Sequence, residues 1–139
     1  RLNIAACSLG AAQHALNKTL TYMEEREAFG KKINQFQALQ FNIADIEIEL
    51  QASRILLRQA AWKLDQKKSD ATHFCAIAKK FITEAGSRVA NQCLQLHGGY
   101  GYLTEYGIEK LVRDLRVHEI LEGTNEIMRL IISRNLTKI

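Results

Sequence analysis

The residue best placed to do chemistry in this sequence is Glu122. It lies between two amphipathic segments and is followed by Gly123, which tolerates backbone angles that other residues avoid. A turn at this glycine can aim the carboxylate into a cleft, and a helix restarting at Thr124 would hold the geometry. The pattern therefore predicts that Glu122 is a catalytic base.

The neighbours of this carboxylate leave two interpretations open. Apolar residues on both sides, Ile120, Leu121 and Ile127, predict a desolvated setting in which a carboxylate becomes a stronger base. The alternative is a solvated acid at the end of a helix. In that alternative Asn125 and Glu126 are exposed polar residues, whereas in the catalytic interpretation they are cofactor contacts in the first turn of a helix.

A second candidate group surrounds a glycine-rich loop. Gln95, Leu96 and His97 precede glycines at positions 98, 99 and 101. One glycine suffices to end a helix, and the others allow another backbone or a flat cofactor to approach closely. Because no strand is expected before this loop, it is not the dinucleotide-binding fingerprint of α/β proteins.

Arg26 is the third candidate. It precedes Phe29 and Gly30 at the end of the first expected helix, where the helix dipole favours a cation whatever its function. The alternative interpretation is a phosphate clamp.

Residue spacing and composition argue against other kinds of site. The four histidines, at positions 14, 73, 97 and 118, are not paired at helical spacing, so no metal site is expected. The three cysteines, at positions 7, 75 and 93, lie far apart in apolar helical patterns, which predicts packed, reduced thiols. The net charge of +4 is dispersed, and no apolar run approaches the ~20 residues of a membrane span. Neither nucleic acid nor a membrane span is therefore expected.

Helices must position these residues. The sequence has no proline and eight glycines, which favours an all-α domain. Apolar periodicity and its breaks predict helices over about residues 2–28, 34–66, 71–97, 108–122 and 124–138. Asn34 and Gln37 have the spacing of a capping box for the second helix. Three long helices and a broken fourth predict one domain over residues 1–139, an antiparallel, up-down-up-down four-helix bundle. The chain begins at Arg1 rather than Met, which predicts a processed protein or a fragment.

Four ordered motifs resemble the C-terminal domain of the acyl-CoA dehydrogenases, and the resemblance spans the whole chain. They are REAFGK with FQ over residues 26–37, QLHGGYGY over 95–102, RD at 113–114 and EGTNEI over 122–127. The family's domain is itself a four-helix bundle. Residues 3–12 and 117–123 are most similar to the members that act on isobutyryl-CoA.

The resemblance implies a role for each matching residue. Glu122 matches the base that removes the α-proton of an acyl thioester while a hydride leaves the β-carbon for FAD. Arg1 matches an arginine at the acyl-CoA site. Matches to FAD contacts are Arg26, Glu27, Ala28, Phe36, Gln37, Gln95, Leu96, His97, Gly98, Gly99, Gly123, Thr124, Asn125 and Glu126. Those that precede Gly123 match contacts to the FAD of a neighbouring subunit.

The resemblance also implies an activity, which is the FAD-dependent α,β-dehydrogenation of a short, branched acyl-CoA. Electrons would pass to an electron-transferring flavoprotein, and the enzyme would be a homodimer or homotetramer of the mitochondrial matrix or bacterial cytoplasm. The family's N-terminal helical and middle β-domains are missing from this sequence, so the isolated domain is expected to be inactive. Some relatives carry the base just before the position of Arg1. An acyl-CoA oxidase and a non-catalytic assembly or binding domain of the same fold are the alternatives.

Overall fold

The structure, a computed structural model, describes residues 1–137. Its helices are α1 (Leu2–Glu25), α2 (Gln37–Asp65), α3 (Ala71–His97), α4 (Ile108–His118) and α5 (Asn125–Thr137). Two 3-10 helices, η1 (Ile33–Gln35) and η2 (Gly98–Tyr102), and the short strands β1 (Glu27–Ala28) and β2 (Lys31–Lys32) complete the described elements. The all-α prediction is confirmed.

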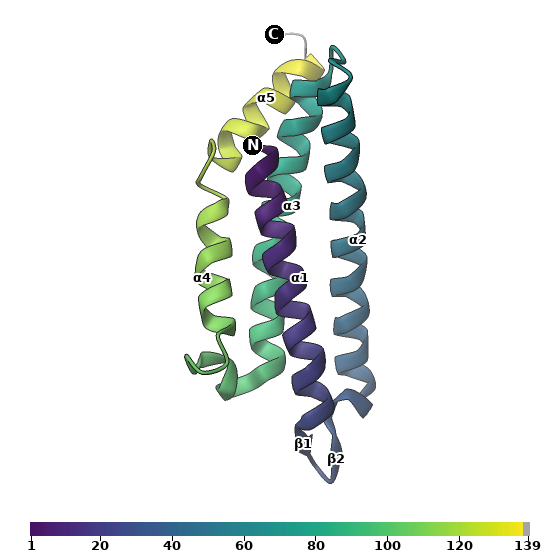
Figure 1. The fold of residues 1–139 in the computed structure, drawn as a ribbon, viewed down its shortest axis with the longest axis vertical. Helices are drawn as coiled ribbons and strands as arrows, with labels where there is room; N and C mark the ends of the chain where they lie inside the picture. Colours follow the sequence, from purple (N-terminus) through teal and green to yellow (C-terminus); the bar gives the residue numbers. More distant parts are fainter. Residues whose placement is uncertain (138–139) are drawn as a thin grey trace.

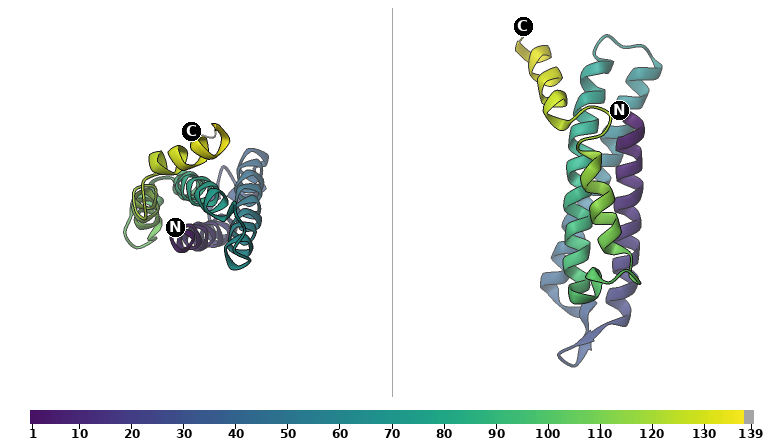
Figure 2. Two further views of the ribbon diagram at one scale, coloured as in Figure 1. Left: turned by 90° about the horizontal axis from the view of Figure 1, so that it is seen from above. Right: turned by 90° about the vertical axis from the view of Figure 1, so that its left-hand side faces the viewer.

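Helices α1 to α4 run side by side and alternate in direction (Figure 1). α1 and α3 pack against each other, and each of them contacts both α2 and α4, which lie on opposite sides (Figure 2). α5 leans away from the bundle and contacts α3. One end of the bundle therefore carries the β1–β2 hairpin and the end of α3, while the other carries the N-terminus and the turn between α4 and α5.

Small side chains let α1 and α3 approach closely. Ala5, Ala12 and Ala15 of α1 are fully buried. On α3, a Cβ added at Gly86 would lie 3.4 Å from both Ser8 and Leu115, so the helices meet tightly there. Larger core residues fill the spaces between the helices, among them Leu16, Ile46, Leu50, Ile82, Val89, Ile108 and Leu115. The bundle is thus held together by burial of apolar surface along its length.

The first helix is shorter than predicted. α1 ends at Glu25, and the chain then forms an antiparallel hairpin in which Ala28 pairs with Lys31. Phe29 and Gly30 connect its strands with φ of 52° and 80°, the two positive values that a type I′ turn requires. The prediction of helix to residue 28 is therefore wrong. Phenylalanine at the first turn position gives none of the usual sequence signal for such a turn.

Two other predicted boundaries are also wrong. The capping box does not form, because α2 begins at Gln37 with Phe36 as its N-cap and no side-chain capping bond. The main-chain carbonyl of Asn34 instead accepts a hydrogen bond of 2.9 Å from Gln40 Nε2. α4 ends at His118, several residues before the predicted end. The expected last residue of the final helix, 138, lies outside the described part of the chain.

The cysteines are free thiols, but they are not all packed. Cys75 and Cys93 are buried as predicted, and burial raises the pKa of Cys93 to about 11, which keeps it protonated. Cys7 is exposed on α1, so the prediction of packing is wrong for that residue. Within residues 1–137, no helix has the length and apolar character needed to cross a bilayer.

Candidate functional site

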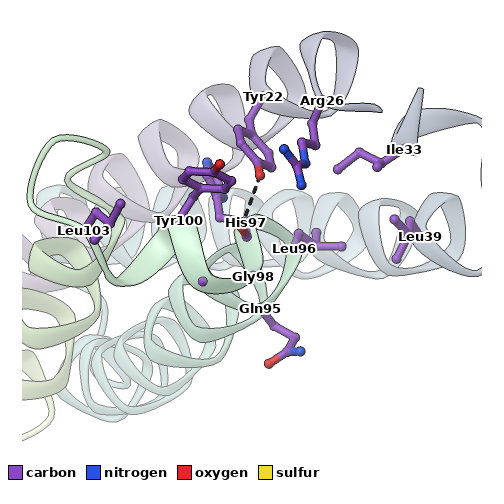
Figure 3. Close-up of a pocket in the computed structure, with 11 residues that line it drawn as sticks. Tyr22, Arg26, Ile33, Leu39, Gln95, Leu96, His97, Gly98, Tyr100 and Leu103 are labelled. Carbon is purple, nitrogen blue, oxygen red and sulfur yellow. Dashed lines mark hydrogen bonds between the residues drawn. The ribbon is translucent and has the colours of Figure 1, made fainter. Parts of the chain in front are cut away.

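The end of α1 and the glycine loop after α3 form one groove of about 450 Å³ (Figure 3). Its lining residues are Tyr22, Arg26, Ile33, Leu39, Gln95, Leu96, His97, Gly98, Gly99, Tyr100 and Leu103. Six of the residues predicted to contact FAD are among them, although they come from two motifs that lie far apart in the sequence. The fold therefore brings the Arg26 motif and the glycine loop together.

The glycines of this loop serve two different purposes. Gly98 ends α3 with φ 57°, and a Cβ added at Gly98 or Gly99 would meet no atom within 4 Å. The main chain of these two residues is thus open to a flat ligand. At Gly101, by contrast, a Cβ would lie 2.8 Å from the carbonyl oxygen of Leu94. The third glycine is required by close approach of another backbone.

This difference predicts the effect of adding a methyl group. We expect Gly101→Ala to lower the free energy of unfolding by on the order of 1 kcal/mol, since the new Cβ collides with main-chain atoms that cannot move freely. Gly10→Ala is the control, because a Cβ there meets nothing within 4 Å and alanine favours a helix interior by about 0.5–1 kcal/mol. Denaturant unfolding of the full-length protein measures both changes, and equal stability of the two variants would contradict the packing seen at Gly101.

Aromatic side chains form the wall of the groove beside Arg26. The Tyr22 hydroxyl donates to the His97 carbonyl at 3.2 Å, and the two rings stack with centroids 4.4 Å apart (Figure 3). The Arg26 guanidinium lies 5.2 Å from the centre of the Tyr100 ring. Burial raises the pKa of Tyr22 and lowers the pKa of His97, so both favour their neutral forms. Arg26 supplies the positive charge of this wall.

His97 uses its side chain inside the protein. Its Nδ1 lies 2.8 Å from the carbonyl oxygen of Cys93, and the residue is only 3% exposed. The ring therefore packs as part of the α3 end, and the His97 carbonyl is already engaged by the Tyr22 hydroxyl. This constraint was not evident from the sequence, in which the residue is a lone histidine.

The remaining predicted contacts of this end lie next to the groove. Glu27 and Ala28 form β1, and Phe36 precedes Gln37, the exposed first residue of α2. The side chain of Glu27 pairs with Lys32 at 2.9 Å, and the hydrogen bond from this lysine lowers the pKa of Glu27. None of these predicted contacts is among the groove's lining residues within the described chain. These four residues therefore belong to the surface beside the groove rather than to its lining.

Glu122 lies in a tight turn at the opposite end of the bundle. Its φ is 59° and that of Gly123 is 90°, both in the left-handed region. Such strain in a residue other than glycine persists only where the surrounding structure enforces it, and it is frequent at functional sites. The main-chain N–H of Asn125 donates to the Glu119 carbonyl at 3.0 Å and closes the turn. Gly123 thus supplies the turn that the sequence predicted.

The same turn brings Arg1 and Glu122 together. The free amino group of residue 1 lies 3.4 Å from Oε2 of Glu122, which places the start of α1 beside the turn although 121 positions separate the two residues; the contact does not involve the Arg1 side chain. These are the two residues predicted to meet the substrate.

The predicted apolar burial of Glu122 does not occur within this chain. The glutamate side chain is 57% exposed. Its apolar neighbours are also exposed, at 53% for Ile120, 44% for Leu121 and 46% for Ile127. The prediction of a desolvated neighbourhood is therefore wrong for this chain, because the turn projects from the end of the bundle and these side chains face outward.

The residues after the turn differ sharply in exposure. Asn125 is 2% exposed, so the alternative that it is an exposed polar residue is wrong. Its side chain is directed into the bundle, where Oδ1 accepts a hydrogen bond of 2.8 Å from Lys79. Glu126 is exposed and pairs with Arg129 at 3.0 Å. The hydroxyl of Thr124 accepts a hydrogen bond from the N–H of Ile127 at 3.4 Å.

The two candidate regions lie far apart in one chain. α1 alone has 24 residues, which corresponds to about 36 Å at 1.5 Å per residue, and the groove and the Glu122 turn lie near its opposite ends. The residues predicted to bind FAD thus form two separate regions. No group of three side chains suited to a metal ion occurs within the described residues.

Sequence reasoning missed several residues that build these regions. Tyr22 and Tyr100 line the groove, and Lys79 and Thr83 support the turn. Tyr22 could have been found, because it lies one helical turn before Arg26 on the same face. Lys79 carries no comparable signal, since a lysine in a helix is usually exposed.

Comparison with known proteins agrees with the arrangement of these motifs. Residues 1–137 match the family described as acyl-CoA dehydrogenase, C-terminal domain. Bovine mitochondrial isobutyryl-CoA dehydrogenase is 47% identical over 136 residues, covering 98% of this chain and 33% of that protein. Among solved structures, the electron transferring flavoprotein structure of Acidaminococcus fermentans matches with a TM-score of 0.95 and 38% identity, over 100% of this chain and 36% of that one. The FAD complex of PigA matches with a TM-score of 0.90 and 33% identity, over 96% of this chain and 34% of the PigA chain.

The chain therefore spans about a third of the length of the relatives that it matches. The resemblance of its four motifs is confirmed by matches that cover almost every residue of the chain. The chain belongs to the acyl-CoA dehydrogenase family, as its C-terminal domain.

Proposed function

We propose that this chain is the C-terminal part of an FAD-dependent enzyme that dehydrogenates a short, branched acyl-CoA, with Glu122 as the base. One observation carries the proposal, which is the strained left-handed turn at Glu122 and Gly123 that projects the glutamate side chain from the end of the bundle. The similarity to isobutyryl-CoA dehydrogenase supports an isobutyryl-like substrate.

Glu122 removes the α-proton of the acyl thioester. The exposed apolar residues beside it, Ile120 and Leu121, are surfaces that the rest of the protein covers, which excludes water from the carboxylate. The turn at Glu122 and Gly123 fixes the direction of the side chain, as proton abstraction requires. FAD, when bound, accepts the hydride that leaves the β-carbon. Gly123, Thr124 and Glu126 would contact the flavin, and the buried Asn125 would act by holding this turn in place.

The groove at the other end fits part of an FAD molecule. The open main chain at Gly98 and Gly99 admits a flat group, and the Arg26 guanidinium is placed to meet a phosphate. Because this groove is far from Glu122 in the same chain, an FAD held here would serve the Glu122 of a neighbouring subunit. Homo-oligomerisation is then required for a complete site.

Assembly has its own candidate surface on α2. Phe41, Ile48, Ile55 and Trp62 recur every seven residues and are 60%, 65%, 69% and 54% exposed. An apolar stripe of this kind on a long helix is typical of a surface that is covered in the assembled protein. We assign it to the contact between subunits of a homodimer or homotetramer.

Charges placed on this stripe should weaken the assembly. In the full-length enzyme, Ile48→Glu with Ile55→Glu puts two carboxylates into a desolvated contact and is expected to shift the protein to smaller species. Analytical ultracentrifugation measures the mass. Asn17→Glu with Thr21→Glu adds the same charge to an exposed face of α1 and is expected to leave the mass unchanged. An unchanged mass in the α2 variant would assign the stripe to another domain of the same chain.

Anaerobic bleaching of the flavin of the full-length enzyme tests the proposed activity directly. Isobutyryl-CoA should bleach it faster than straight-chain acyl-CoA of the same length, and the isolated domain should show no activity. Reoxidation should require an electron-transferring flavoprotein, as in an enzyme of the mitochondrial matrix or bacterial cytoplasm. Peroxide release under air would instead identify an acyl-CoA oxidase, and absence of bleaching by any acyl-CoA would identify a non-catalytic relative.

A further inference from the structure

Lys79 is a fully buried lysine near the end of the bundle that carries the Glu122 turn. It lies on α3 and is 0% exposed, whereas lysine is almost never fully buried unless its charge is paired. Its Nζ donates to Asn125 Oδ1 at 2.8 Å and to the carbonyl oxygen of Glu119 at 3.2 Å. Both acceptors belong to the turn that carries Glu122.

The two acceptors lie at the two ends of that turn. Glu119 follows the last residue of α4, and Asn125 is the first residue of α5. Their main chains also share the hydrogen bond that closes the turn, so the ammonium group of Lys79 and the N–H of Asn125 donate to the same carbonyl oxygen. Lys79 therefore fixes α3 to both ends of the segment that holds Glu122 in its left-handed conformation.

A second layer of contacts holds Asn125 in place. Its Nδ2 donates to the Thr83 hydroxyl at 3.1 Å, and that hydroxyl donates to the Lys79 carbonyl oxygen at 2.9 Å. Nδ2 also lies 3.4 Å from Oε1 of Glu84, which in turn pairs with Arg129 of α5 at 3.0 Å. The polar groups around the turn thus form one connected network with Lys79 at its centre.

Burying the ammonium group of Lys79 in this network costs desolvation free energy. Burial lowers the pKa of Lys79, because the charged form loses solvation, and carboxylates at Glu119, Glu126, Glu122 and Glu84 favour the charged form. The two hydrogen bonds of Lys79 join both ends of the turn to α3 and so fix the geometry of the turn.

We propose that Lys79 is the positioning residue of the base, acting through Glu119 and Asn125 to fix the turn from which the Glu122 carboxylate reaches the substrate. The inference rests on the proposed function of Glu122. It adds a requirement, which is that the chemical step depends on an ammonium group that touches neither substrate nor cofactor.

Lys79→Met in the full-length enzyme tests this role. Methionine keeps the length and volume of the side chain and removes both hydrogen bonds. A base displaced by about 1 Å can cost ~10²-fold in rate, so we expect the limiting rate of flavin reduction by isobutyryl-CoA to fall roughly 10- to 100-fold. The melting temperature should fall somewhat, because two buried acceptors lose the ammonium donor. The dissociation constant for acyl-CoA and the FAD content should stay close to those of the wild type, a pattern that a general structural defect does not produce.

Lys110→Met is the matched control, since Lys110 is an exposed lysine of α4 that pairs with Asp114. It should leave the reduction rate unchanged. Wild-type reduction in the Lys79→Met enzyme would overturn the proposal, and so would a loss explained entirely by weaker acyl-CoA binding. If Lys79→Met does not fold, Thr83→Val tests the same positioning role, because this variant removes only the hydroxyl that accepts a hydrogen bond from Asn125. We expect a several-fold loss in rate, and a wild-type rate would again overturn the proposal.

The same assay separates this inference from the proposed function. Normal flavin reduction in a Glu122→Gln enzyme would refute the role of Glu122 as the base, and the proposed role of Lys79 would fail with it. A Glu122→Gln enzyme that is inactive beside a Lys79→Met enzyme of wild-type rate would leave the base in place and refute the role of Lys79 alone.

Discussion

Glu122→Gln in the full-length enzyme should lower the rate of flavin reduction by roughly 10²- to 10⁴-fold, which is the range that general-base catalysis contributes. Glutamine has the same shape but does not accept the α-proton. The side chain is 57% exposed in this domain, so the substitution removes no packing within the chain. Stopped-flow reduction by isobutyryl-CoA without oxygen measures the chemical step, and titration of the oxidised enzyme measures acyl-CoA binding.

Glu109→Gln serves as the control for this prediction. Glu109 lies in the first turn of α4, at the far end of the helix that leads to the Glu122 turn, and its contact with Arg113 is a weak 3.8 Å. We expect normal reduction in that variant. Near-normal reduction in Glu122→Gln, by contrast, would place the base elsewhere, and the position just before Arg1 used by some relatives would be the next to test.

The helical content of the domain followed from the sequence, because apolar periodicity is a property of each segment by itself. α3 was predicted to end where the glycines begin, and it ends at His97. The Gly123 turn was likewise predicted from a local signal, since a positive φ favours glycine. Joining Arg26 to the glycine loop required the ordered motifs of the family, because neither segment alone specifies its neighbour.

Features that depend on contacts between distant residues were not predictable in the same way. The burial of Asn125 depends on Lys79, 46 positions away, and no local pattern reports that pairing. The exposure of Glu122 depends on the shape of the bundle end, where neighbouring apolar residues face outward. The hairpin after α1 was missed because the residue with the first positive φ is Phe29, a type that rarely adopts this conformation.

Arg26→Met should weaken FAD binding while leaving the chemical step intact. A charge-assisted hydrogen bond contributes about 1.5–3 kcal/mol, so we expect roughly a 10- to 150-fold rise in the dissociation constant for FAD. Reconstitution of the full-length apoenzyme, followed by flavin fluorescence, measures this constant. Because Arg26 follows the last residue of α1 and Glu122 lies beside the first residue of the chain, saturating FAD should restore the wild-type rate of reduction. Arg113→Met, whose side chain is 81% exposed on α4, should bind FAD normally.

The distance between the two ends also makes subunit sharing testable. If the groove of one subunit holds the FAD that serves its neighbour, an oligomer that mixes Arg26→Met subunits with Glu122→Gln subunits contains some sites with both residues intact. At an FAD concentration too low to saturate Arg26→Met, the mixed preparation should therefore recover activity that neither variant shows alone. Failure to recover activity, with mixed oligomers demonstrated by mass, would mean that Arg26 and Glu122 do not meet across subunits. The groove would then bind a ligand other than the catalytic FAD.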